Sequence, residues 1–162
     1  MLIRMLESGR DVALVSDAGT PGIADPGFYL VRIAIEQGIK VVPIPGPSAP
    51  IASLSASGLP TDRFVFEGFL PAKKGKRLER LRLLREEERT IVIYESPHHI
   101  LRLLEEVLAV IGNRRAVLAR ELTKMHEEFL RGTVEEITRK IKEMDTVRGE
   151  ITVLIAGKRT ER

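Results

Sequence analysis

The stretch Val12-Ala-Leu-Val-Ser16, followed by Asp17-Ala-Gly-Thr-Pro-Gly-Ile-Ala-Asp-Pro-Gly27, decides the fold of the first part of the chain. Valine and leucine favour extended structure, and the glycine and proline cluster ends it, so the pattern predicts a buried parallel strand that runs into a stiff loop. Apolar residues at helical spacing from Phe28 to Gln37, stopped by Gly38, predict a helix. Ligands of open α/β sheets bind at the carboxyl ends of strands, where this loop would lie.

A second loop of the same kind follows the next expected strand, Ile39 to Ile44. It reads Pro45-Gly-Pro-Ser-Ala-Pro50 and leads into a small-residue helix from Ile51 to Ser57. Right-handed crossovers place consecutive loops of this type at one edge of the sheet, so the two should share a crevice. Glycines that only turn the chain are the alternative for the first loop alone.

Six blocks resemble, in order, the ribosomal RNA small subunit methyltransferase I family, which belongs to the tetrapyrrole methylases. They are Ser16–Gly27, Ile44–Ala49, Phe66–Lys73, Tyr94–His98, Ala119–Lys124 with Glu127–Gly132, and Arg148–Glu150. Ala24 stands where the family usually has serine, and His99 where it usually has arginine. The family's opening strand and Pro-Ile-Gly-Asn loop have no counterpart, so the chain resembles a truncated member.

The resemblance implies an α/β, tetrapyrrole-methylase-like fold of two αβα units, each with a parallel or mixed sheet, the first unit being incomplete. It also implies S-adenosylmethionine as the cofactor. The loop residues expected to hold its methionine part are Asp17, Ala18, Gly19, Thr20, Pro21, Ile23, Pro45, Gly46, Ser48 and Ala49. The residues expected to border the adenosine from the second domain are Tyr94, Glu95, Ala119, Arg120, Gly149, Glu150, Ile151 and Thr152.

The implied reaction is in-line transfer of the sulfonium methyl group to a ribose 2′-hydroxyl of a cytidine in small-subunit ribosomal RNA, with no metal. Because that hydroxyl is a weak acid, a base should take its proton, and Glu121 and His126 are candidates by location alone. The candidate substrate contacts are Lys73, Lys74, Lys76, His98, Lys124 and Arg131. The expected partners are ribosomal RNA or the small ribosomal subunit, and a second copy in a homodimer.

The basic run from Lys73 to Arg85 can be interpreted in two ways. Lysine and arginine on one segment can release counterions from RNA, which favours the loop lysines as phosphate contacts. For the helix that follows, from about Arg77 to Glu87, a solvated face balanced by Glu79 and by 86–88 is the preferred interpretation.

Length and composition bound the remaining possibilities. A chain of 162 residues holds one or two small domains. The turn cluster Gly58–Asp62 marks a change of composition, so we expect domains at 1–60 and 61–162. The first 60 residues carry a net charge of −1 and the rest +4, which makes a polyanionic partner plausible for the second part. No cysteine and no long apolar run are present, so we expect no disulfide, no membrane span and a cytoplasmic location.

The second part should alternate strands and helices. Expected strands are 63–68, 90–94, 116–119, 129–132 and 151–155. Ser96 with Pro97 should cap a helix that reaches Ile111, and Thr133 with Glu136 should form a capping box.

Two other functions remain open. The chain could be a catalytically inactive fragment or dimerisation module of this family, or a tetrapyrrole methyltransferase of the precorrin type. A P-loop nucleotide triphosphatase and a hydrolase with a G-x-S-x-G elbow are disfavoured because both motifs are missing.

Overall fold

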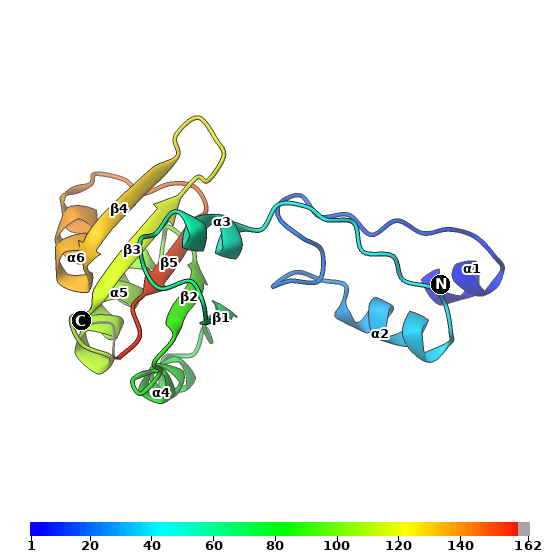
Figure 1. The fold of residues 1–162 in the computed structure, drawn as a ribbon, viewed down its shortest axis with the longest axis horizontal. Helices are drawn as coiled ribbons and strands as arrows, with labels where there is room; N and C mark the ends of the chain where they lie inside the picture. Colours follow the sequence, from blue (N-terminus) through cyan, green and yellow to red (C-terminus); the bar gives the residue numbers. More distant parts are fainter. Residues whose placement is uncertain (159–162) are drawn as a thin grey trace. The chain divides into compact units, whose positions relative to one another are not determined.

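A computed structural model of the protein, which describes residues 1–158, divides into two compact units, Met1–Ser48 and the remainder from Ala49 (Figure 1). We expected the boundary near residue 60. The helix α3 (Ala49–Ser55) belongs instead to the second unit, because Leu54 and Leu59 pack against the strand residues Val92, Val117 and Leu154. The last four residues of the expected second domain lie outside the described residues.

The first unit contains two helices, α1 (Leu2–Glu7) and α2 (Phe28–Glu36), which contact each other. The helix α2 ends as expected, with Gly38 at φ +70° and the Ile39 amide donating to Ala34 O at 2.9 Å. The strands expected at 12–16 and 39–44 are wrong, since neither segment forms a strand here. A strand exists only through pairing, and no described residue pairs with these segments, so Val15 and Ile44 stay 81% and 80% exposed.

The described residues of the second unit form a five-stranded mixed sheet in the order β1-β2-β5-β3-β4. Its strands are β1 (Phe64–Phe69), β2 (Thr90–Glu95), β3 (Arg115–Arg120), β4 (Glu128–Thr133) and β5 (Ile151–Ile155). β1 runs parallel to β2, whereas β5 is antiparallel to both β2 and β3, and β4 is antiparallel to β3. The carboxyl ends of β1, β2 and β3 therefore lie at one edge of the sheet.

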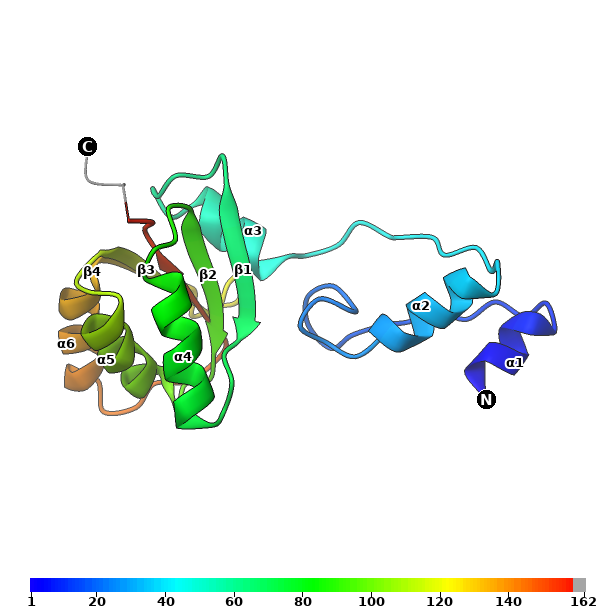
Figure 2. The same cartoon turned by 90° about the horizontal axis from the view of Figure 1, so that it is seen from below.

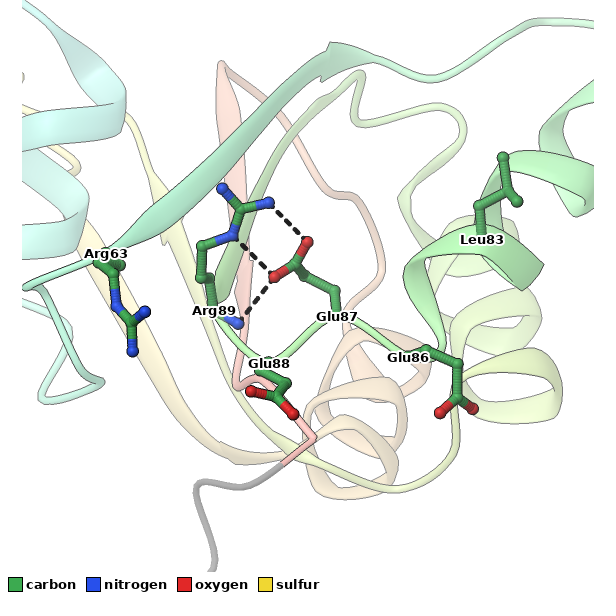
Figure 3. Close-up of a pocket in the computed structure, with 6 residues that line it drawn as sticks. All are labelled: Arg63, Leu83, Glu86, Glu87, Glu88 and Arg89. Atoms are coloured by element: carbon green, nitrogen blue, oxygen red, sulfur yellow. Dashed lines mark hydrogen bonds and ion pairs between the residues drawn. The ribbon is translucent and has the colours of Figure 1, made fainter.

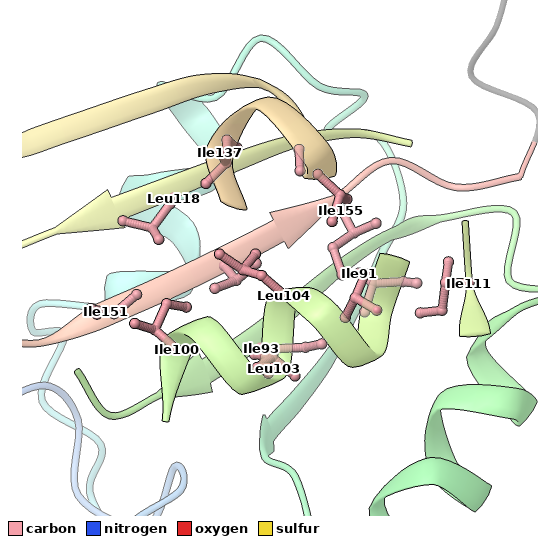
Figure 4. Packing of buried hydrophobic residues seen from close by; sticks show 14 of the residues in the cluster. Ile91, Ile93, Ile100, Leu103, Leu104, Ile111, Leu118, Ile137, Ile151 and Ile155 are labelled. Carbon is pink, nitrogen blue, oxygen red and sulfur yellow. The ribbon is translucent and has the colours of Figure 1, made fainter. Parts of the chain in front are cut away.

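Three helices cover one face of this sheet and α3 lies on the other (Figure 2). The three are α4 (Lys74–Leu84), α5 (Ile100–Val110) and α6 (Val134–Glu143). Strand alternation explains the division, because Ile91 and Ile93 face the three helices while Val92 faces α3. The larger cluster packs α5 residues such as Leu103 and Leu104 against those isoleucines (Figure 4). No helix among residues 1–158 has the length and apolarity needed to cross a bilayer.

The expected amino-terminal cap is present on α6 and absent from α5. Thr133 and Glu136 form the expected capping box, with the Glu136 amide donating to Thr133 Oγ1 at 3.2 Å. Ser96 does not cap α5. Residues 97–99 form a turn, which the amide of His99 closes on Ser96 O at 3.0 Å, and the helix begins only at Ile100.

Candidate functional site

In the first unit, a hydrogen bond joins the two glycine-proline loops. Thr20 Oγ1 donates to the carbonyl oxygen of Pro47 at 2.8 Å, although 27 positions separate them in the sequence. The two loops therefore meet within this unit, although the strands expected before them do not form, and the crevice that they should share stays a prediction. Ser48, which follows directly, is half-buried.

The first loop depends on its glycines. Gly19, Gly22 and Gly27 all have positive φ, and a Cβ on Gly27 would lie 2.7 Å from Leu14 Cδ2. Ala24, the departure noted above, also has a positive φ of 54°. Around Gly19 and Gly22 a Cβ would meet nothing within 4 Å, so their backbone groups remain open to approach. The remaining expected loop residues, mostly exposed, are Asp17, Ala18, Pro21, Ile23, Pro45 and Gly46.

In the second unit, the expected adenosine-bordering residues converge at the edge where β2 and β3 end and β5 begins. Tyr94 pairs with Thr152, which pairs with Ala119. One position further, Glu95 pairs with Ile151, which pairs with Arg120. Because side chains alternate along a strand, these two rows face opposite sides of the sheet. One ligand can therefore meet the side chains of only one row on a given face.

The row of Tyr94 lies on the face of α3 and carries an aromatic cluster that the sequence analysis missed. The Tyr94 ring lies 5.0 Å from that of Phe66 and 5.5 Å from that of Phe69, between centroids. Burial, and to a lesser extent the charge of Glu150, raise the pKa of Tyr94, so its phenol stays protonated and can donate. The phenylalanines of β1 could have indicated this cluster, but the sequence did not show that β1 pairs with β2, the strand that carries Tyr94.

The row of Arg120 lies on the face of α5 and α6 and holds polar atoms without partners. Arg120 Nη2 lies 2.8 Å from Glu128 Oε2, an ion pair whose alignment is too poor for a hydrogen bond. Arg120 Nε and Ser96 Oγ are buried and have no hydrogen-bond partner in the described structure. Such atoms are costly unless something satisfies them.

Glu121 begins the loop after β3 and is engaged by its neighbours. Its Oε1 accepts from the Glu150 amide at 2.9 Å and from Lys124 Nζ at 3.0 Å. The backbone bond from Glu150 and the Lys124 ammonium lower the pKa of Glu121. Both effects weaken Glu121 as a general base. His126, the other candidate base, is exposed on the same loop.

The expected RNA-contacting residues fall into two groups. Lys73, Lys74 and Lys76 are exposed at the first turn of α4, which contains no acidic residue. Lys124 and Arg131, in contrast, are engaged within the protein. Lys124 Nζ lies between Glu121 and Glu150, 3.2 Å from the latter's Oε2. Arg131 donates to Ala56 O at 2.7 Å and lies 4.6 Å from the centre of the Phe129 ring. His98 is exposed in the turn before α5.

Two arginines of the basic run are not available for phosphate. Arg77 is buried and forms two hydrogen bonds with Glu106, at 2.6 and 2.8 Å. Arg80 forms a similar pair with Glu67, at 2.6 and 2.7 Å. Both arginines thus have a structural role, but the expected solvated face balanced by Glu79 and by 86–88 is wrong for them. Arg77 is buried, and the carboxylates that pair with the two arginines are Glu106 and Glu67.

A shallow pocket opens at the opposite edge of the sheet, near the starts of β1 and β2 (Figure 3). Its lining residues are Arg63, Leu83, Glu86, Glu87, Glu88 and Arg89. Arg89 donates to both carboxylate oxygens of Glu87 at 2.8 Å and lowers its pKa to about 2. The polar lining is thus largely paired within the protein, and none of the expected site residues reaches this pocket.

A mixed sheet with helices on both faces places the second unit in the α/β class, and its candidate ligand-binding residues lie at the strand ends. The model of the family Tetrapyrrole (Corrin/Porphyrin) Methylases matches residues 1–138. The chain therefore belongs to the tetrapyrrole methylase family.

Curated relatives of one name are about half identical to this chain. The chain is 53% identical over 157 residues to "Ribosomal RNA small subunit methyltransferase I" of Pseudomonas aeruginosa, covering 96% of this chain and 56% of the relative. It is 49% identical to the protein of that name from Escherichia coli O157:H7, covering 99% of this chain and 57% of the relative. The chain thus spans about half the length of the curated relatives it matches.

Solved structures share the fold at low identity. The methyltransferase CobJ has a TM-score of 0.70 at 22% identity, with 99% of this chain and 70% of that chain covered. Uroporphyrin-III C-methyl transferase from Thermus thermophilus, complexed with S-adenyl homocysteine, has a TM-score of 0.57 at 19% identity, with 97% and 69% covered. These similarities support the fold alone.

Proposed function

We propose that this chain takes part in S-adenosylmethionine-dependent 2′-O-methylation of a cytidine ribose in small-subunit ribosomal RNA. The observation that carries the proposal is identity near 50% with relatives named ribosomal RNA small subunit methyltransferase I, over nearly the whole chain. The chain spans about half of those relatives, so their activity is extended to it here as a hypothesis.

Each unit, taken by itself, has groups that suit one part of S-adenosylmethionine: the first unit its amino acid part, and the second unit its nucleoside part. The first unit offers open backbone at Gly19 and Gly22 together with the Thr20 hydroxyl. The second offers, on the α3 face of its sheet, the aromatic ring of Tyr94 beside Thr152. When bound, S-adenosylmethionine supplies an already activated methyl group. The chain's own task is then to hold the accepting hydroxyl in line with it.

The first turn of α4 is the proposed RNA contact. Lysines at a helix amino terminus oppose the helix dipole, and acidic residues would be the stabilising choice there. We therefore interpret Lys73, Lys74 and Lys76 as phosphate-binding residues, since the amino terminus of a helix also attracts phosphate. His126 is the proposed proton acceptor, since the contacts of Glu121 lower the pKa of its carboxyl group. We further propose a cytoplasmic homodimer.

A methyl-transfer assay tests the proposal. Small ribosomal subunits that lack the modification are incubated with the chain and methyl-labelled S-adenosylmethionine, and label is followed into RNA and mapped to a nucleotide. Label at a cytidine 2′-oxygen is the expected result. No label, with S-adenosylhomocysteine binding retained in calorimetry, would identify the chain as an inactive module, and light scattering would report whether that module dimerises.

The family model favours one second candidate, methyl transfer to a tetrapyrrole. The same assay with a precorrin as acceptor separates the two. Label in the precorrin and none in ribosomal RNA would replace the RNA proposal.

A further inference from the structure

Glu121 has a backbone conformation that its residue type disfavours. Its φ is +51°, and Thr123 two positions later has φ +65°. Residues other than glycine keep such conformations only where surrounding contacts hold them, and these outliers gather at functional sites. The contacts that hold Glu121 lead to the segment before β5.

Three contacts join Glu121 to that segment. The Glu121 amide donates to Glu150 O at 3.0 Å, and Glu121 Oε1 accepts from the Glu150 amide at 2.9 Å. Gly149 has φ +91°, and a Cβ there would overlap the Glu121 carboxylate and its Cγ. Gly149 thus provides both the turn and the space in which the side chain of Glu121 lies.

Lys124 closes the arrangement from the solvent side. Its Nζ lies 3.0 Å from Glu121 Oε1 and 3.2 Å from Glu150 Oε2, so one ammonium bridges the two carboxylates. These contacts continue the ladder between β3 and β5 beyond its last pair, Arg120 with Ile151. A shift of Glu150 would therefore move Ile151 and Thr152 relative to Arg120 and Ala119.

We propose that Glu121 is a positioning residue: its carboxylate fixes the start of β5 against the end of β3 and so keeps Thr152 in place beside Ala119 and Tyr94 for the cofactor. The inference rests on the proposed function for the identity of the ligand, and on the hydrogen bonds of Glu121 for the role itself. It assigns Lys124 to the same task and leaves Glu121 out of proton transfer.

Two substitutions at one position separate positioning from base catalysis. Glu121→Gln keeps an oxygen that can accept from the Glu150 amide, whereas Glu121→Ala removes it. Glu127→Ala is the matched control, since Glu127 Oε2 accepts from the Thr123 amide at 2.6 Å in the same loop without contacting Glu150.

Amide hydrogen exchange on the full chain is the first measurement, and it needs neither cofactor nor activity. We expect E121A to speed exchange of the Glu150 amide roughly tenfold, as loss of a hydrogen bond to a charged acceptor should. E121Q and E127A should stay within about threefold of the parent chain at that amide, because both keep its acceptor. Equal exchange in E121A and the parent chain would overturn the proposal, as would equal acceleration in E121A and E121Q.

Calorimetry with S-adenosylhomocysteine is the second measurement. E121A should weaken binding about tenfold and E121Q less than threefold, in line with a lost or kept backbone contact. Unchanged affinity in E121A despite faster exchange would refute the positioning of a cofactor site. A loss of methyl transfer beyond about a hundredfold in E121Q, with binding intact, would instead make Glu121 the base. If the parent chain binds no S-adenosylhomocysteine, the proposed function fails while hydrogen exchange still decides the structural role.

Discussion

Replacing Arg77 by methionine tests how the second unit holds the loop residues Pro71 and Ala72, which precede α4. The Arg77 side chain is 2% exposed, and its Nε and Nη2 donate to the two carboxylate oxygens of Glu106 at 2.6 and 2.8 Å. Its Nη1 donates to Ala72 O at 2.8 Å and to Pro71 O at 3.3 Å. One guanidinium therefore links α4, α5 and the loop that precedes the exposed lysines.

Removing one partner of a buried ion pair costs about 3–5 kcal/mol, because the other charge stays buried without compensation. The Glu106 side chain retains 12% exposure, so water can reach it in part, and we expect about 3 kcal/mol for R77M. The double variant R77M/E106L removes both charges and should recover to within about 1 kcal/mol of the parent chain.

Urea unfolding followed by far-ultraviolet circular dichroism measures these changes. K142M is the control, because Lys142 pairs with Glu105 at 2.8 Å while both side chains are about half exposed, at 53% and 50%. Solvent can reach the carboxylate that K142M leaves behind, so we expect a cost below about 1 kcal/mol. Costs that are equal for R77M and K142M, or a double variant less stable than R77M, would refute the reasoning.

The same pair predicts a pH dependence. The hydrogen bonds and charge of Arg77 lower the pKa of Glu106. A carboxyl group with a lowered folded-state pKa contributes stability that is fully present above its unfolded pKa, near 4.3, and is lost as the pH falls through the folded value. The difference in unfolding free energy between the parent chain and R77M should therefore be constant near neutrality and narrow below about pH 4. A difference that widens on acidification would contradict this assignment.

Three further predictions concern single contacts. Gly149→Ala should destabilise the chain more than Gly112→Ala, as measured by urea midpoints. Both glycines have positive φ, so each substitution costs about 1 kcal/mol in backbone strain, but only a Cβ at Gly149 would also overlap the Glu121 side chain. Thr133→Ala should lose about 1 kcal/mol with the capping box, while Thr133→Ser, which keeps the hydroxyl, should lose little in thermal unfolding. Thr20→Val should speed hydrogen exchange across 16–27, because the bond to Pro47 O is lost; unchanged exchange would show that the loops meet without it.

The sequence predicted the second unit better than the first, for a physical reason. Each expected strand from Arg63 onward exists, because its apolar residues find neighbours within the described chain. The segments 12–16 and 39–44 carry the same signal and form no strand. The strand propensity of a segment says that its side chains suit a half-buried sheet. It does not say whether another strand is present to pair with that segment.

The site shows a second limit of the same kind. Motif blocks name consecutive residues, such as Tyr94 with Glu95 and Ala119 with Arg120, as one cofactor-bordering group. The sheet separates each pair onto opposite faces, and it adds Phe66 and Phe69 to one of them. Alternation along a strand, which the sequence already contains, causes the separation. The pairing of β1 with β2, which no local pattern contains, brings the two phenylalanines to Tyr94.

This separation changes how a single ligand could use both members of a pair. Side chains of Tyr94 and Thr152 can face a ligand on the α3 side, while Arg120 faces α5 and α6. A ligand at the carboxyl ends of β2 and β3 can instead meet backbone groups of the loops that follow these strands. Contact through the backbone depends on where the chain lies rather than on which side chains it carries. That dependence gives the fastening of Glu150 by Glu121 its importance at a site whose side chains point in two directions.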